Sequence, residues 1–244
     1  MYKQVSGRYG ECVFLGSDEY VGRSMFYYGE YNPAETAMIL SLARGLCLDI
    51  GANIGVISQA LLAHGRSVEA FEPQPELHTL LQQNCLSAKR IRGGEPYFLT
   101  HNVAVGSETG TAKMPKVHYS AKGNFGGLGI GATSLYGYYD VPVVTIDSYN
   151  YDDVGFIKID VEGYEYEVLC GASETIARCR PILYIEDDRT EKSRALRAKI
   201  ESLGYSIEEH QPPLYDEDNY FGLKRNVWKH NYASFNLICK PNAN

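Results

Sequence analysis

Short apolar segments alternate with amphipathic segments along most of this chain. The apolar segments have the length of buried strands, and they are Leu46–Ile50, Ser67–Phe71, Tyr97–Val105, Val141–Ile146, Phe156–Val161 and Pro181–Ile185. Between them, apolar residues recur every three or four positions, as at Leu77, Leu80 and Leu81, which is typical of helices that pack on one face. Strands and helices in alternation predict an α/β fold, with a mostly parallel sheet and helices on both of its faces.

The N-terminal part departs from this alternation. Residues 1–32 indicate short strands and turns, with Glu11–Leu15 and Arg23–Tyr28 as candidate strands. At Asn32-Pro33 a helix start follows, because asparagine caps helices and proline fits their first turn. We therefore expect an N-terminal extension over residues 1–32 and a single domain over residues 33–244.

Less regular segments follow the third predicted strand. A hairpin into Thr111–Val117 is expected first, and residues 118–137 then form a glycine-rich segment, which suits either a flexible surface loop or a mobile flap over a pocket. Near the C-terminus, Tyr205–Glu209 and Phe235–Lys240 indicate two closing strands. They are joined by the aromatic and polar segment 210–234, which is too long for a hairpin turn.

Charge and composition exclude some classes of function. The net charge of −7, with no large basic cluster, argues against a nucleic-acid partner. No apolar run approaches the roughly 20 residues of a membrane span, and the N-terminus has no apolar signal core, so we expect a soluble, cytoplasmic protein. The six cysteines are scattered without a Cys-x-x-Cys pair, which favours free thiols over disulfides or a zinc site.

A glycine-rich turn follows the first apolar strand. Gly51, Asn53 and Gly55 separate Leu46–Ile50 from an amphipathic helix. A strand, a glycine turn and a helix N-terminus in this order are typical of a nucleotide-type site, since glycine allows a sharp turn and a close ligand. The dinucleotide pattern Gly-x-Gly-x-x-Gly is absent, because Asn53 stands where its second glycine would be.

Two carboxylates narrow the choice of ligand. Glu72 ends the next strand, about twenty residues on, where a carboxylate can accept the hydroxyls of a ribose. Asp49 precedes the turn and would repel a pyrophosphate but not an ammonium or a sulfonium group. NAD and S-adenosylmethionine both carry such a ribose, and the missing glycine together with Asp49 favours S-adenosylmethionine. Taken singly, Asp49 could be a turn residue and Glu72 a plain strand-end carboxylate.

The chain at this point resembles the FkbM-type S-adenosylmethionine-dependent methyltransferases. The resemblance is carried by Leu-Asp-Ile-Gly-Ala-Asn-Ile-Gly at 48–55, Phe-Glu-Pro-Gln-Pro at 71–75 and Ile-Lys-Ile-Asp-Val-Glu-Gly-Tyr-Glu at 157–165, and it spans roughly residues 30–240. It implies a class I methyltransferase fold, Rossmann-like, with a seven-stranded, mostly parallel sheet that ends in an antiparallel hairpin. It also implies methylation of hydroxyl oxygens, often on sugars or polyketides.

The resemblance further assigns cofactor-binding residues. The methionine part of the cofactor would be lined by Asp49, Gly51, Asn53 and Gly55, the ribose would be held by Glu72, and the adenine would be bordered by Asn102, Val103 and Ala104. The family's lead-in segment also matches residues 31–35, which would place Glu30 or Glu35 toward the cofactor.

Candidate catalytic residues lie at the ends of two later strands. Lys158, Asp160 and Glu162 alternate and so share one face of an extended segment, and Glu186 ends the next strand. Converging carboxylates suit a general base, for which we favour Asp160 with Glu186 and Lys158 beside it, or oxygen ligands for Mg²⁺ or Ca²⁺. In the alternative interpretation Glu162 caps a helix and Lys158 pairs with a carboxylate. In neither interpretation is a particular residue assigned as a metal ligand.

The sequence thus predicts an S-adenosylmethionine-dependent O-methyltransferase. Its acceptor would be a small molecule with a hydroxyl group, in particular a sugar-containing one, since many of the 20 tyrosines fall in segments that could stack on sugar rings. The alternatives are an NAD-linked oxidoreductase on a similar sheet and a methyltransferase-like binding protein without catalysis.

Overall fold

A seven-stranded sheet forms the centre of the computed structural model, which describes residues 2–93, 95–228 and 233–242. Its strand order is β11-β12-β10-β9-β3-β4-β5, and β12 runs antiparallel to the other six strands. The strands are β3 (Leu46–Ile50), β4 (Val68–Phe71), β5 (Phe98–His101), β9 (Val154–Ile159), β10 (Ile182–Glu186), β11 (Tyr205–His210) and β12 (Asn236–Pro241). The predicted α/β fold with a C-terminal antiparallel hairpin is confirmed.

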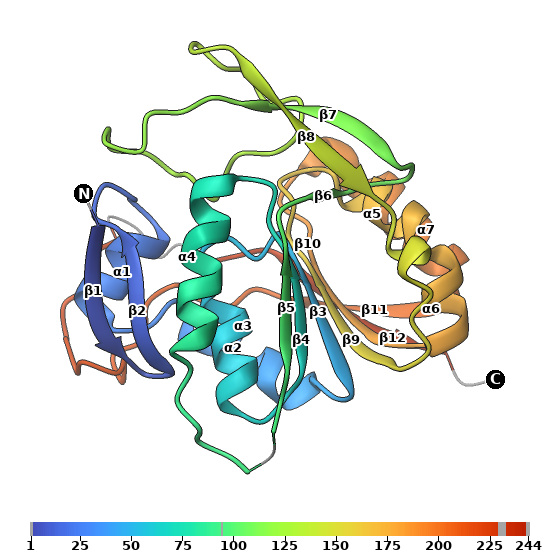
Figure 1. Ribbon diagram of the computed structural model, residues 1–244. Helices are drawn as coiled ribbons and strands as arrows, with labels where there is room; N and C mark the ends of the chain where they lie inside the picture. Colours follow the sequence, from blue (N-terminus) through green and yellow to red (C-terminus); the bar gives the residue numbers. More distant parts are fainter. Residues whose placement is uncertain (1, 94, 229–232, 243–244) are drawn as a thin grey trace.

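Helices cover both faces of this sheet (Figure 1). One face carries α2 (Pro33–Leu42), α3 (Val56–Ala63) and α4 (Pro75–Leu86), and the other carries α5 (Glu165–Gly171), α6 (Ser173–Cys179) and α7 (Thr190–Ser202). Along β3, Cys47 packs into the apolar core beneath α2, α3 and α4, whereas Leu48 and Ile50 pack into the core beneath α5, α6 and α7. The central strands are apolar throughout because both of their faces are buried.

A small second sheet lies above the carboxyl ends of the large one (Figure 1). It has the order β6-β8-β7 and consists of β6 (Ala104–Val105), β7 (Gly110–Pro115) and β8 (Tyr138–Val144). The prediction of one strand over Tyr97–Val105 was therefore wrong, because the chain leaves the large sheet after His101. The expected hairpin was also wrong, since β6 and β7 pair with β8 on either side and not with each other.

The N-terminal residues form a hairpin and a helix rather than strands alone. Strands β1 (Tyr2–Gly7) and β2 (Gly10–Leu15) pair antiparallel, which confirms the strand predicted at Glu11–Leu15. The strand predicted over Arg23–Tyr28 is instead part of helix α1 (Val21–Tyr28), which buries Val21, Met25 and Tyr28 at helical spacing. The division of the chain at residue 32 stays a prediction.

Asn84 on α4 fixes the hairpin to the domain. Its amide oxygen accepts the Val13 backbone N–H at 2.7 Å, and its amide nitrogen donates to the carbonyl oxygens of Val13 and Ile54 at 3.0 and 2.7 Å. The Asn84 side chain is fully buried and its bond to the Ile54 carbonyl is buried as well, so water is a poor substitute partner there.

Two further expectations concern cysteine and the membrane. All six cysteines are free thiols, as predicted. Within the described ranges, no helix is long and apolar enough to cross a membrane. The cytoplasmic location stays a prediction.

We expect Asn84→Ala to lower the free energy of unfolding by about 2 kcal/mol or more, because it leaves the buried Ile54 carbonyl and the partly buried Val13 backbone groups without their partner. Chemical denaturation measures this change. Gln83→Ala is the matched control, since Gln83 is exposed on the same helix. Equal unfolding free energies for the two variants would contradict the proposed anchoring role.

Candidate active site

A cavity of about 510 Å³ opens at the carboxyl ends of the parallel strands. Its walls come from the turn after β3, the ends of β4, β9 and β10, the start of α2, and the segments 126–130 and 233–235. This is the position at which open α/β sheets bind ligands, because the loops after neighbouring strands diverge there.

The turn after β3 requires glycine at its first position. Gly51 has φ +81°, and a Cβ atom there would lie 1.7 Å from the Asp160 carbonyl oxygen at the end of β9. Asn53 follows with φ 53°, a left-handed conformation that asparagine tolerates. Gly55 has φ +83°, and a Cβ there would meet Leu81 of α4, so Gly55 serves helix packing and does not line the cavity.

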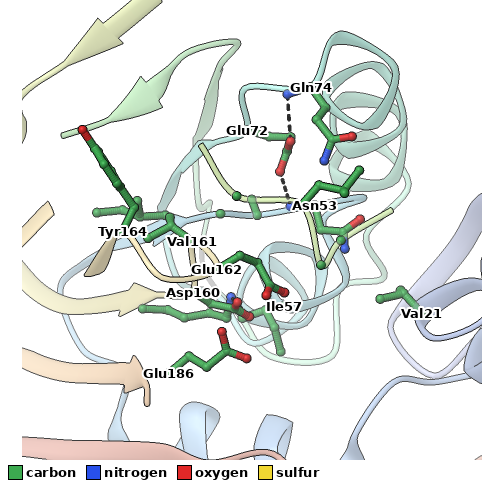
Figure 2. Close-up of a pocket in the computed structure, with 18 of the residues that line it drawn as sticks. Val21, Asn53, Ile57, Glu72, Gln74, Asp160, Val161, Glu162, Tyr164 and Glu186 are labelled. Atoms are coloured by element: carbon green, nitrogen blue, oxygen red, sulfur yellow. Dashed lines mark hydrogen bonds and ion pairs between the residues drawn. The ribbon is translucent and has the colours of Figure 1, made fainter. Parts of the chain in front are cut away.

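Glu72 is held rigidly at the end of β4 by backbone donors. Its two carboxylate oxygens accept the N–H groups of Asn53 at 2.9 Å and Gln74 at 2.8 Å (Figure 2). Behind it, the Asn102 amide donates to the carbonyl oxygens of Glu72 and Pro73. Burial raises the pKa of Glu72 from 4.5 to about 7, although the two backbone N–H groups oppose that rise.

Lys158 is a buried cation between two carboxylates. Its Nζ lies 3.1 Å from Asp160 Oδ2 and 3.7 Å from Asp49 Oδ1, and Ser58 Oγ donates to Asp49 Oδ2 at 2.6 Å. Burial alone lowers the pKa of Lys158, but the charges of Asp160, Asp49 and Glu35 outweigh it, so the pKa is raised. Asp49 itself is fully buried behind the wall of the cavity.

Three carboxylates converge at the ends of β9 and β10. Asp160, Glu162 and Glu186 each offer an oxygen within 4.8 Å of the others, and Figure 2 shows them turned toward one another. Burial and the Asp160 charge raise the pKa of Glu162 to about 8 and the pKa of Glu186 well above its usual range. The helix-capping alternative for Glu162 was wrong, because Glu165 accepts the N–H groups of this loop and Glu162 pairs with Arg189.

The structure brings most of the predicted site residues to one cavity. The predicted residues that line it are Gly51, Asn53, Glu72, Val103, Ala104, Lys158, Asp160 and Glu186. Asp49, Gly55 and Asn102 do not line it but support residues that do. Of the two lead-in glutamates, Glu35 lines the cavity, whereas Glu30 is turned away and pairs with Arg8.

Glu35 is bonded to a residue from the far end of the chain. Its carboxylate accepts hydrogen bonds from the Asn32 amide and, at 3.2 Å, from Ser234 Oγ. Burial raises its pKa to about 7, with the Lys158 charge acting in the opposite direction. Residues 233–235 therefore form part of the cavity wall beside the start of α2.

Several cavity residues were not predicted. The sequence had left residues 118–137 as either a loop or a flap, and the structure places Gly126–Ile130 in the cavity wall. Gln74 lies within the 71–75 motif but was not assigned a role, Met114 contributes from β7, and Arg189 contributes from the start of α7. The one available signal was the alternation of glycine with Leu128 and Ile130, which is unusual for a fully exposed loop.

Comparisons with known proteins identify the family. Residues 49–207, more than half of the chain, match the family described as Methyltransferase FkbM domain. The chain belongs to this methyltransferase family. No curated protein matches it significantly. The match decides against the NAD-linked oxidoreductase and confirms the resemblance seen in the three motifs.

Solved structures agree with this fold. The chain is similar to methyltransferase FkbM from Methylobacillus flagellatus KT, with 19% identity and a TM-score of 0.50, over 81% of this chain and 45% of that one. It is also similar to a Pyrococcus abyssi tRNA (uracil-54, C5)-methyltransferase in complex with S-adenosyl-L-homocysteine, with 9% identity and a TM-score of 0.54, over 98% and 44% of the two chains. The chain thus spans less than half the length of these two proteins, and the likeness shows the class I methyltransferase fold.

We expect the Glu72 carboxyl to titrate near pH 7 in the ligand-free protein, because burial disfavours its charged form. Carbon NMR of labelled glutamate side chains measures this, and the spectrum of Glu72→Gln identifies the signal. The proton is bound more tightly in the folded state, so this group's contribution to stability is full below about pH 4.5 and is lost as the pH rises through about 7. A midpoint near 4.5 would contradict the burial argument.

Proposed function

We propose that this chain transfers a methyl group from S-adenosylmethionine to a hydroxyl oxygen of a small acceptor. The observation that carries the proposal is the position of Glu72, a rigid carboxylate on one side of a cavity whose other side holds the Asp160 cluster. Family membership supports methyl transfer as the class of reaction. The choice of oxygen as the methylated atom rests on the cluster of carboxylates.

The cavity residues fit the proposed cofactor. Each Glu72 oxygen accepts one backbone N–H and keeps lone-pair capacity for a ribose hydroxyl. Val103 and Ala104 offer an apolar border for an adenine, and Gly51 and Asn53 line the part of the cavity proposed for the methionine part of the cofactor. The cofactor would supply a methyl group made electrophilic by its sulfonium, and the excess of carboxylates over cations in the cavity suits its positive charges.

The residues of this chain would then orient and deprotonate the acceptor. Asp160 is the proposed general base, because it lies at the cavity edge and its Oδ2 is oriented by the Lys158 ammonium at 3.1 Å. Glu186 extends the same acidic surface and would hold the hydroxyl or receive its proton. Tyr20, Tyr31 and Tyr164 also line the cavity and offer aromatic surface, which supports a sugar-containing acceptor.

We expect S-adenosylhomocysteine to bind the purified protein, and Glu72→Ala to weaken that binding by about tenfold or more, since hydrogen bonds to a charged group contribute about 1.5–3 kcal/mol. Isothermal titration calorimetry measures both affinities. Glu174→Ala is the control, because Glu174 is exposed on α6 away from the cavity. The proposal fails if the wild-type protein does not bind, or if the two variants bind equally well.

We expect Asp160→Asn to reduce turnover by about 10²–10⁴-fold, because the amide retains the shape of the side chain but cannot take a proton. A panel of hydroxylated sugars and simple alcohols serves as acceptors, with release of S-adenosylhomocysteine as the readout. Cofactor affinity should stay within about threefold of the wild type, since the base acts on the acceptor. Unchanged turnover would remove Asp160 from the mechanism.

A further inference from the structure

We propose that Asp160, Glu162 and Glu186 bind a divalent cation at the acceptor end of the cavity. The cation would be a hard one, of the class of Mg²⁺, Mn²⁺ or Ca²⁺, because all three ligands are carboxylates. The binding site follows from the geometry alone, whereas its role in the reaction rests on the proposed function.

The spacing of the three carboxylates suits a single ion. Their nearest oxygens all lie within 4.8 Å of one another. Ca²⁺ binds oxygen at about 2.3–2.6 Å, so two oxygens on opposite sides of one ion lie about 4.6–5.2 Å apart, and neighbouring ligand oxygens lie closer together. Asp160 and Glu162 follow β9 and Glu186 ends β10, so adjacent parallel strands fix the separation. The cluster is therefore held by the sheet and by the loop directly after it.

A buried oxygen without a partner gives an independent indication. Glu186 Oε2 is shielded from solvent and has no hydrogen-bond partner within the described part of the chain. The Glu186 side chain as a whole is partly exposed, and Figure 2 shows its carboxylate turned toward Asp160 and Glu162. A carboxylate oxygen in this position costs free energy unless something binds it, because burial removes its water without replacing it.

The neighbouring cations are already engaged with other carboxylates. Lys158 lies between Asp160 and Asp49, and Arg189 pairs with Glu162 and Asp188. Neither forms an ion pair with Glu186 among the pairs that the structure shows. Around the cluster, four carboxylates (Asp160, Glu162, Glu186 and Asp188) face two cations, Lys158 and Arg189. A divalent cation would balance the excess of carboxylates.

Three carboxylate ligands leave coordination positions open toward the cavity. An acceptor hydroxyl that occupied one of them would become more acidic, because the cation stabilises the alkoxide. In that step the hydroxyl proton passes to a cluster carboxylate and the oxygen bonds to the methyl carbon. The carbon–sulfur bond breaks at the same time, and its electron pair stays on sulfur, which becomes a neutral thioether.

Manganese binding tests the site without any acceptor. Protein stripped with a chelator is titrated with Mn²⁺ at pH 8, and the bound ion is counted by electron paramagnetic resonance. We expect one site, weakened about tenfold or more in Glu186→Gln, as for the loss of groups that support a metal site. The control Glu174→Gln should bind Mn²⁺ like the wild type, and thermal unfolding checks that each variant is folded.

The outcomes separate this proposal from the proposed function. Mn²⁺ that does not bind at millimolar concentration, or that binds equally well to Glu186→Gln, overturns the cation site, including the case in which protons alone neutralise the cluster. Affinity for S-adenosylhomocysteine is measured on the same samples. If that ligand binds and Mn²⁺ does not, only the cation site fails. If Mn²⁺ binds and the ligand does not, the cation site stands and the proposed methyl transfer fails.

Discussion

The close approach of the turn after β3 to the end of β9 determines the geometry of the whole site. The Asp160 carbonyl oxygen occupies the space that a side chain at position 51 would need, so only glycine allows the two strand ends to meet. Backbone hydrogen bonds on both sides fix this arrangement: Gly51 N–H donates to the Phe71 carbonyl, and Asp160 N–H donates to the Ile50 carbonyl. As a result Glu72, at the end of β4, and Asp160, at the end of β9, face one cavity from the two sides of β3.

Buried charge is the second constraint, and it depends on the first. The register of β3 against β9 places Asp49 opposite Lys158, on the face covered by α2, α3 and α4. A lysine that is only 5% exposed is tolerated there because carboxylates surround it and compensate for its lost hydration. Its ammonium in turn orients Asp160. Buried side chains are thus connected to the cavity edge. Ser58 donates a hydrogen bond to Asp49, and Lys158 forms ion pairs with both Asp49 and Asp160.

The sequence could predict those parts of the molecule that depend on local pattern. The strand and turn at Leu46–Gly55 and the carboxylate at Glu72 follow from apolar runs, glycine spacing and strand ends, all of which are local. The role of Asp49 could not be predicted in the same way, because it depends on which residue of β9 lies opposite, and strand register is a long-range property. The break between β5 and β6 was missed because Tyr97–Val105 has continuous strand-like pattern but changes sheets in the middle. Helix α1 was missed because its tyrosines and phenylalanine favour strands, whereas the buried set Val21, Met25 and Tyr28 has helical spacing.

The two sides of the cavity are built from different kinds of structural element, and this difference affects which substitutions could change acceptor preference. The proposed cofactor side consists of strand ends and a tight turn whose conformations are fixed by backbone contacts, so we expect substitutions there to disturb the fold as well as binding. The proposed acceptor side adds residues 126–130, Arg189 and Ser234, which lie in segments that connect the strands of the large sheet. Because Ser234 bonds to Glu35, the C-terminal segment is nevertheless tied to the helix that begins at the cofactor side. A change in that segment could therefore alter acceptor preference without changing the cofactor cradle, provided that the bond to Glu35 is retained.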